Sequence, residues 1–177
     1  MAAVARGRRR PVVVGNGTEG EPASSKDRLL LLHEPHLVLD GLAAATQTLD
    51  ADFAVLCVDV DDDPVSDSVE RALVERRSRK IDRVDIRVER APDRYVAGEE
   101  TALVAWLNGH EAKPTFTPPR PFERGVRNRP TLVNNVETLA NVGLIARYGS
   151  DWFRSLGDPV EPGSMLLTVT GAVASPG

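Results

Sequence analysis

Residues Phe53–Asp59, with the sequence FAVLCVD, constrain the fold more than any other segment of the chain. The run is almost continuously apolar and shows no alternation between apolar and polar side chains. A strand with one solvated face alternates, whereas a strand of a parallel sheet is covered on both faces and does not. The segment therefore predicts a buried strand in a sheet that carries other layers on both sides.

Three other segments also have strand-like patterns. Pro11–Gly15 (PVVVG) is a short apolar run that ends at a glycine, which predicts a second buried strand. Val84–Arg90 alternates between apolar and charged residues, which predicts a strand exposed on one face. Near the C-terminus, Met165–Val173 has the composition of a strand that opens a new unit.

Helical periodicity separates these strands. A helix is predicted over Asp27–Leu49, interrupted near Pro35 because proline disfavours the helical conformation of the residue before it. Three more helices are predicted over residues 66–79, 96–108 and 134–148, with Asp67–Glu70 and Asn134–Glu137 as the capping pairs of the first and the last. This succession of strands and helices predicts an α/β fold with a mostly parallel sheet and flanking helices.

The composition excludes several classes of function. The chain has 177 residues, of which 41% are hydrophobic and 27% charged, as in a globular domain large enough to bury a core. Its single cysteine, Cys57, excludes an intrachain disulfide and any zinc or iron–sulfur site held by several thiolates of this chain alone. No run of about 18 apolar residues exists, so we expect no direct membrane insertion. The net charge of −4 argues against general nucleic-acid binding.

Polar residues gather at three places that a parallel sheet brings to one edge, where ligands of such folds bind. The first loop, Asn16–Pro22, contains two glycines that allow the backbone to approach a ligand closely. The second, Gly98–Thr101, and the third, Val133–Thr138, lie at predicted helix starts, where unpaired N–H groups suit an anion or a carbonyl oxygen. A structural interpretation, in which Asn134, Glu99 and Thr18 serve only as caps, stays open.

Four other features have both a functional and a structural interpretation. The acidic triplet Asp61–Asp63 is either a metal site or a solvated turn. The basic cluster within residues 76–80 is either an anion-binding patch or a set of cations that complement the helix dipole. The arginine-rich residues 1–10 are either an arm for an acidic partner or a loose terminus. Cys57, inside the predicted strand, is most simply a small buried hydrophobe.

Three stretches of the chain resemble a known family: NGTEGEPASSKDRLLLLHEPHLVLDG (Asn16–Gly41), YVAGEETALVAWLNG (Tyr95–Gly109) and RPTLVNNVETLANV (Arg129–Val142). They are similar to the NADH- and FMN-binding subunit of respiratory complex I, and to subunits of NAD-reducing hydrogenases and NAD-dependent formate dehydrogenases. The four arginines of residues 1–10 predict a disordered basic N-terminus. The resemblance implies a Rossmann-like FMN- and NADH-binding domain over residues 11–160, incomplete at its N-terminus. It further implies that residues 161–177 begin a ubiquitin-like (β-grasp) domain, with Leu166–Gly177 as its opening strand.

The resemblance also implies a set of ligand contacts. It assigns FMN binding to ten residues of the three loops: Asn16, Thr18, Glu19, Gly98, Glu99, Glu100, Val133, Asn134, Asn135 and Thr138. It places Glu21 and Glu100 next to NADH. The implied reaction is hydride transfer from NADH to FMN, followed by single-electron transfer to iron–sulfur centres, with the cofactor carrying the chemistry.

The sequence also departs from the family pattern. Thr18 stands where the family usually has an aspartate that binds flavin, and Thr117 and Arg120 stand where it usually has a lysine and an aromatic residue near NADH. The family's glycine-rich flavin loop and its cluster-binding cysteines have no counterpart in these 177 residues. We therefore expect a truncated, divergent member that does not itself bind the iron–sulfur cluster and is not competent alone.

These observations lead to one principal hypothesis and one alternative. The first is the FMN-binding portion of an NADH dehydrogenase subunit, cytoplasmic or peripheral to a membrane complex, whose partners are iron–sulfur electron-transfer subunits. The alternative is a docking or scaffold relative in an electron-transfer complex that has lost flavin or NADH binding.

Overall fold

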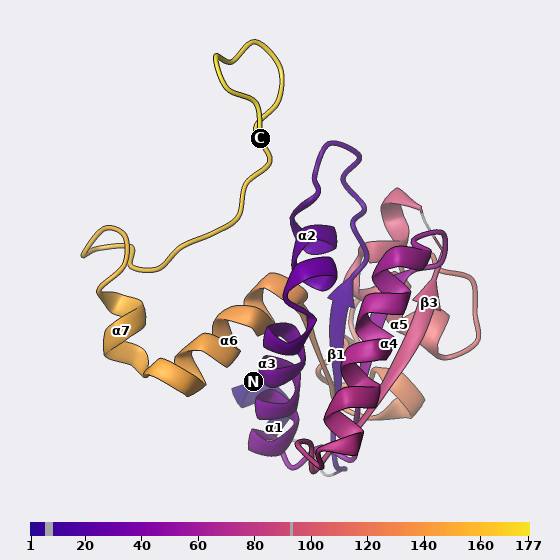
Figure 1. The fold of residues 1–177 in the computed structure, drawn as a ribbon. Helices are drawn as coiled ribbons and strands as arrows, with labels where there is room; N and C mark the ends of the chain where they lie inside the picture. Colours follow the sequence, from indigo (N-terminus) through magenta and orange to yellow (C-terminus); the bar gives the residue numbers. More distant parts are fainter. Residues whose placement is uncertain (6–8, 93) are drawn as a thin grey trace.

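A four-stranded parallel sheet forms the centre of the computed structural model, which describes residues 1–5, 9–92 and 94–177 (Figure 1). The strands are β1 (Val12–Gly17), β2 (Phe53–Asp59), β3 (Asp85–Ala91) and β4 (Thr131–Asn135), in the order β3-β2-β1-β4. Val12 of β1 is in register with Phe53 of β2 on one side and with Thr131 of β4 on the other. The predicted α/β fold with a parallel sheet is therefore confirmed.

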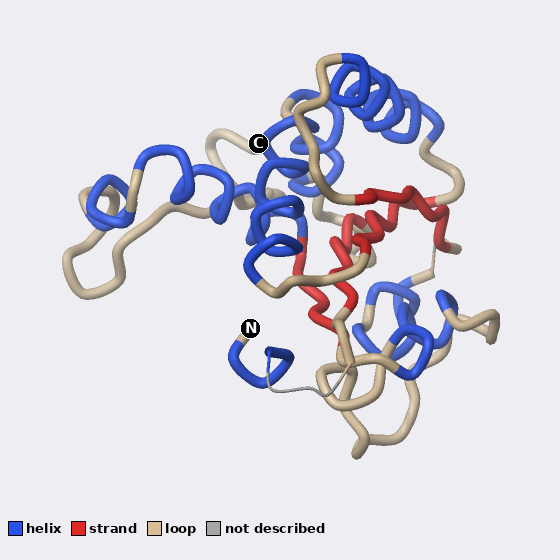
Figure 2. The backbone as a smooth tube through the Cα atoms, turned by 90° about the horizontal axis from the view of Figure 1, so that it is seen from below, coloured by secondary structure: helices blue, strands red, loops and turns tan. Residues whose placement is uncertain are grey.

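Helices and turns cover both faces of the sheet, as Figure 2 shows in the view from below. One face packs against α2 (Lys26–His33), α3 (Pro35–Thr48), α4 (Asp63–Ser78) and α6 (Val136–Tyr148). The other face packs against α5 (Glu100–Leu107) and the short 3-10 turn η2 (Val126–Asn128), while the turn η1 (Tyr95–Gly98) leads into α5. In β1, Val13 faces the first layer and Val14 the second, and both are fully buried. This two-sided burial explains the lack of alternation in β2.

Helices α3 and α6 meet backbone to backbone. A Cβ atom at Gly41 of α3 would lie 1.7 Å from the carbonyl oxygen of Leu139, and one at Gly143 of α6 would lie 2.8 Å from the carbonyl oxygen of Leu37. No side chain fits at such separations, so the two glycines set how closely the helices approach. This contact positions the start of α6, which lies at the carboxyl end of β4.

The helix boundaries differ from the prediction at α4. The helix begins at Asp63 rather than near Asp67, and its N-cap is Asp62, whose carboxylate accepts a 3.3 Å hydrogen bond from the Val65 N–H. Pro64 lies in the first turn of the helix and does not break it. Backbone N–H groups in a first turn have no partner within the helix, so the N–H that proline lacks is not missed there. The predicted capping box of Asp67 and Glu70 is wrong.

Arg76, which belongs to the basic cluster near the end of α4, is buried. Only 4% of the side chain is exposed, and its Nη2 atom lies 2.7 Å from Asp82 and 2.8 Å from Asp40. The hydrogen bond with Asp82 is the main reason that the pKa of Arg76 is raised, against the lowering effect of burial. Arg76 therefore joins α4 to α3 and to the turn before β3.

Two strand predictions also change. Strand β4 was not predicted, and it displaces the start of the last long helix to Val136, with Asn135 rather than Asn134 as N-cap. Residues Met165–Val173 were predicted as a strand, but the structure forms none there, and these residues are exposed. They lie on an extended segment that follows α7 (Ser150–Arg154) and projects from the body, shown in yellow in Figure 1. The predicted first strand of a β-grasp domain is therefore not formed in this structure.

The N-terminal residues show more order than expected where they are described. Ala2–Ala5 forms the short helix α1, and Val4 is only 2% exposed. Arg10 forms ion pairs with Asp50 at 2.6 Å and Asp52 at 3.1 Å. The prediction of a disordered basic segment also covers residues 6–8, which lie outside the described residues. Among the described residues, no helix has both the length and the apolar character needed to cross a membrane.

Candidate functional site

The three predicted loops converge at the carboxyl ends of β1 and β4. Strand β1 continues through α2 and α3 to β2 on one side of it, while β4 lies on its other side, so the connections diverge between β1 and β4. Ligands of open parallel sheets bind at such switch points. A cavity of about 490 Å³ opens there, within the range of small-molecule sites. The residues that line it come from all three loops, from the start of α2, from η1 and from the segment after α5: Asn16, Thr18, Glu19, Gly20, Glu21, Lys26, Asp27, Val96, Gly98, Glu99, Pro114 and Asn135.

Asn16, the penultimate residue of β1, ties the first loop to the second. Its Nδ2 donates a 2.7 Å hydrogen bond to the carbonyl oxygen of Gly98. Its Oδ1 accepts hydrogen bonds from the N–H of Thr18 at 3.2 Å and from the Thr18 hydroxyl at 2.7 Å. A Cβ atom at Gly98 would lie 2.9 Å from the Thr18 Oγ1 atom, so glycine keeps the two loops in contact and the cavity wall free of a side chain.

Glu99 caps α5 with its own carboxylate. The Oε2 atom accepts hydrogen bonds from the N–H groups of Thr101 at 2.9 Å and Ala102 at 3.0 Å, and from the Thr101 hydroxyl at 2.5 Å. These N–H groups were predicted to be open to a ligand. The structural interpretation of Glu99 as a cap is therefore correct, although Glu99 also lines the cavity.

Asn135 caps α6 and lines the same cavity as Gly98. Its Oδ1 accepts hydrogen bonds from the Glu137 N–H at 2.9 Å and from the Lys26 ammonium at 3.0 Å. Its Nδ2 donates to the Asp27 carboxylate at 2.6 Å. Lys26 and Asp27, at the start of α2, were not predicted as site residues. An adjacent cation and anion at a helix start usually indicate a solvated end, so no sequence signal marked them.

The remaining predicted residues divide between the cavity and its surroundings. Glu19 and Glu21 line the cavity, and Glu19 also accepts a 2.8 Å hydrogen bond from the Asp27 N–H. The other four predicted residues are not among the lining residues: Glu100, Val133, Asn134 and Thr138. Glu100 and Thr138 are exposed near the helix starts, and Val133 packs against the second apolar layer.

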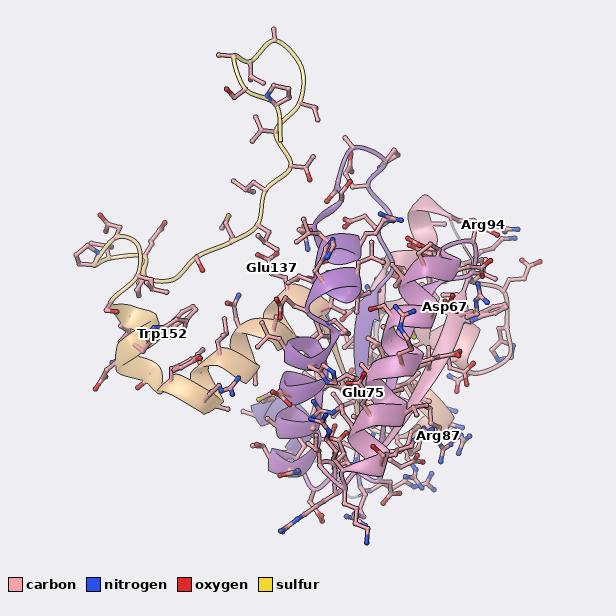
Figure 3. All side chains as sticks on the ribbon, in the orientation of Figure 1. Asp67, Glu75, Arg87, Arg94, Glu137 and Trp152 are labelled. Atoms are coloured by element: carbon pink, nitrogen blue, oxygen red, sulfur yellow. The ribbon has the colours of Figure 1, made fainter. Side chains whose placement is uncertain are left out.

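A second cavity of about 610 Å³ adjoins the first, between the β1–α2 loop and the start of α4. Glu19, Gly20 and Glu21 line both cavities, so this loop is the wall between them. The far side of the second cavity carries Arg28, which pairs with Asp62 at 2.7 Å, and Arg94. Figure 3 shows Arg94 and Glu137 at the same end of the molecule, opposite Arg87.

The first cavity is acidic. Of the described residues that line it, four carry carboxylates and Lys26 carries the one ammonium group. Burial raises the pKa of Asp27, although Lys26 and Asn135 lower it. Burial lowers the pKa of Lys26, but its hydrogen bonds and charge interactions with Asp27 and Glu137 outweigh this effect, so the pKa is raised. Lys26 therefore stays protonated and partly offsets the negative charge.

Other predicted features lie apart from this edge or take a structural role. Asp61–Asp63 forms the turn and first residue of α4, and no group of three or more His, Cys, Asp or Glu side chains among the described residues is arranged to hold a metal ion. Cys57 is fully buried in β2, and burial raises the pKa of its thiol, which confirms its interpretation as a buried hydrophobe. Thr117 and Arg120 are exposed in the long loop before β4.

The residues present fit a flavin better at its ring and polyol than at its phosphate. Glycine and asparagine at the rim leave a wall of backbone and amide groups that can pair with carbonyl and hydroxyl groups. The Gly98 position, where a Cβ would meet Thr18, is a cradle that a larger residue would fill. Among the described residues that line this cavity, Lys26 is the one cation that a phosphate group can meet, and it lies among four carboxylates.

Comparisons with known proteins agree with this geometry. Residues 2–144 match the family model described as the Nuo51 FMN-binding domain. The chain is 34% identical over 171 residues to a subunit of an NADH-quinone oxidoreductase of Rhizobium meliloti, covering 92% of this chain and 41% of the relative. It is 35% identical over 175 residues to the alpha subunit of the NAD-reducing hydrogenase HoxS of Cupriavidus necator, covering 93% of this chain and 29% of the relative.

Solved structures show the same relationship. A crystal structure of an NAD+-reducing NiFe hydrogenase in the air-oxidized state superposes with a TM-score of 0.91 at 34% identity, covering 99% of this chain and 31% of that one. The chain thus spans less than half the length of the relatives it matches. The sequence match and the superposition show that this protein belongs to the Nuo51 FMN-binding domain family.

Proposed function

We propose that this chain is the FMN-binding portion of an NADH-oxidising subunit and that FMN binds at the edge formed by β1 and β4. The observation that supports it is the convergence of Asn16, Gly98 and Asn135, from three distant segments, on one cavity at the switch point of a family whose model is an FMN-binding domain. When bound, FMN supplies a ring that accepts a hydride from NADH and passes on single electrons.

The chain's own residues bind and orient the flavin in this proposal. Gly98 leaves room for the flat ring, and the Asn16 hydrogen bond fixes the position of that glycine. The first turn of α6, near Asn134 and Thr138, lies next to the polar tail in this proposal, because the helix dipole favours negative charge there. Val133 supports this wall from the apolar layer beneath.

In this proposal, carboxylates near the cavity bind NADH. Glu21 lines both cavities and Glu100 is exposed at the start of α5, so both are available to hydroxyl groups of NADH. Thr18 keeps the loop in place through its hydrogen bond to Asn16, without the negative charge of an aspartate. Thr117 and Arg120 give the exposed loop a different surface from the lysine and aromatic residue that the family resemblance led us to expect.

The wider activity follows from the relatives, which are subunits of an NADH-quinone oxidoreductase and of an NAD-reducing hydrogenase. We propose that electrons leave the flavin for iron–sulfur centres outside this chain, in partner subunits of a multi-subunit complex. The complex would lie in the cytoplasm or at the periphery of a membrane.

A flavin titration tests this proposal. Adding the purified chain to FMN is expected to quench flavin fluorescence, and NADH is expected to bleach the visible absorbance of the bound flavin. The Gly98→Val variant, whose side chain meets Thr18, should lose quenching, while Asn141→Ala on α6 should retain it. Absence of quenching by a folded wild-type chain at high FMN would reject flavin binding.

One observation favours a second candidate, a docking or scaffold relative without flavin. The polar side chains of Asn16, Glu99 and Asn135 already hydrogen-bond to neighbouring loops and helix starts, as expected if they only stabilise the fold. The same titration distinguishes the two, since a scaffold protein would keep its fold and bind neither FMN nor NADH.

A further inference from the structure

Lys26, Asp27 and Asn135 form a closed ring of hydrogen bonds beneath the cavity. The Lys26 ammonium donates to the Asp27 Oδ1 atom at 2.6 Å and to the Asn135 Oδ1 atom at 3.0 Å. The Asn135 Nδ2 donates to the other Asp27 oxygen at 2.6 Å. Each member thus contacts the other two, although 108 positions separate Asp27 from Asn135.

The ion pair of the ring is largely buried. The side chain of Asp27 is 3% exposed and that of Lys26 is 25% exposed. The ammonium also lies 3.3 Å from the Glu137 carboxylate, in the first turn of α6. Water and salt screen buried charges less than surface charges, so the Lys26–Asp27 pair interacts strongly with the Asn135 amide.

The two charges determine which way the Asn135 amide points. The oxygen and nitrogen ends of an asparagine amide have nearly the same shape, so their hydrogen-bond partners select the orientation. A lysine ammonium only donates and a carboxylate only accepts. Turning the amide over would place its NH₂ group against the Lys26 ammonium and its oxygen against the Asp27 carboxylate, and both contacts would be repulsive.

We propose that the Lys26–Asp27 ion pair is the positioning device of the cavity: it fixes the Asn135 amide and fastens the start of α2 to the end of β4. Neither residue needs to touch a ligand in this role. Fixing the amide keeps Asn135 Oδ1 on the Glu137 N–H, and so preserves the cap of α6. It also holds Asn135 Nδ2 on the side of the Asn16 carbonyl oxygen, 3.5 Å away.

A ligand-free measurement tests the positioning directly. Hydrogen exchange of the Asn135 side-chain amide and of the Glu137 backbone amide is followed by NMR in the full chain. Asp27→Asn and Lys26→Met should speed exchange at both groups by about tenfold, because the first replaces the charged acceptor by a neutral one and the second removes the charged donor. Lys26→Arg keeps a donor and should restore slow exchange. Asp52→Asn, which breaks ion pairs with Arg10 and Arg129 at the opposite end of the sheet, should have no effect at either group.

The outcomes of this measurement are decisive. Unchanged exchange at Asn135 and Glu137 in a folded Asp27→Asn variant would overturn the proposal. If Asp27→Asn fails to fold, the comparison of Lys26→Met with Lys26→Arg decides instead, and equal exchange in those two variants would overturn it.

Flavin binding provides the second readout, and here the inference rests on the proposed function. Asp27→Asn and Lys26→Met should each weaken FMN binding by about tenfold, while Asp52→Asn should bind as the wild type does. Unaltered FMN affinity in variants that release the Asn135 amide would show that the device does not serve the flavin, and would overturn that part of the inference. A wild-type chain that does not bind FMN would reject the proposed function, and the exchange measurement would still decide the role of the pair.

Discussion

The side-chain amide of Asn16 donates a 2.7 Å hydrogen bond to the carbonyl oxygen of Gly98, 82 positions further along the chain. One end of the central strand is thereby joined to the turn before α5, and both residues line the cavity. The Thr18 hydroxyl holds the other end of the same amide. The spacing of the two loops therefore depends on a single side chain.

Replacing Asn16 by alanine is expected to lower the free energy of unfolding by about 1–2 kcal/mol, because it removes three partly buried hydrogen bonds. FMN affinity should fall as the Gly98 turn loosens. Urea unfolding and a flavin titration measure the two effects, with Asn141→Ala as the control. A variant as stable as the wild type that also binds FMN equally well would contradict this role.

Replacing Gly41 by alanine is expected to destabilise the fold by more than about 3 kcal/mol, since the added methyl group would overlap the Leu139 carbonyl oxygen at 1.7 Å. Gly109→Ala is the matched control. Gly109 has a φ of +84° but open space around its Cβ position, so alanine there should cost only about 1 kcal/mol. Thermal unfolding of both variants tests the difference. Similar decreases in stability in the two variants would show that α3 and α6 can move apart at little cost in free energy.

Replacing Arg76 by alanine is expected to cost about 3–5 kcal/mol, because it leaves the Asp82 carboxylate, only 13% exposed, without its cation. Arg87→Ala removes an ion pair with Asp85 whose partners are about half exposed, and should cost less than about 1 kcal/mol. Chemical denaturation of the two variants gives both values. A small decrease in the free energy of unfolding of Arg76→Ala would mean that water reaches the Asp82 carboxylate readily.

The stability contribution of Asp27 is expected to depend on pH. Burial raises its pKa in the folded state above the ordinary value of 3.8. Between the unfolded and folded pKa values the folded state binds more protons, so the free energy of unfolding falls as the pH rises through that window. The stability of the wild type relative to Asp27→Asn should therefore decrease upward from about pH 3.8 and then become constant. Urea unfolding across this range measures it, and a relative stability that increases with pH would contradict the buried assignment.

Strong local patterns made much of the fold predictable from the sequence. Phe53–Asp59 lacks alternation because both of its faces are covered, and this showed directly as a continuous apolar run. Pro35 divides two helices where the sequence placed the break. The convergence of the three loops also followed, because parallel strands end at one edge of the sheet.

The predictions from the sequence were wrong or incomplete where contacts with residues far away in the sequence determine the structure. Thr131–Asn135 is short and ends in two asparagines, and it becomes a strand because β1 offers a parallel neighbour. Met165–Val173 has the right composition for a strand but pairs with none of the described strands. The Lys26–Asp27 pair resembled an ordinary helix start, and its burial depends on Asn135, a residue far away in the sequence.

The burial of Cys57 has a practical consequence. The chain has one thiol, and it lies with no exposed surface in a central strand, where burial keeps it protonated. A thiol-specific reagent can therefore react only after the sheet opens, since the thiolate is the nucleophile. Without any engineered label, the labelling rate at this atom reports how often the centre of the protein becomes accessible, and ligands that tighten the fold will slow it.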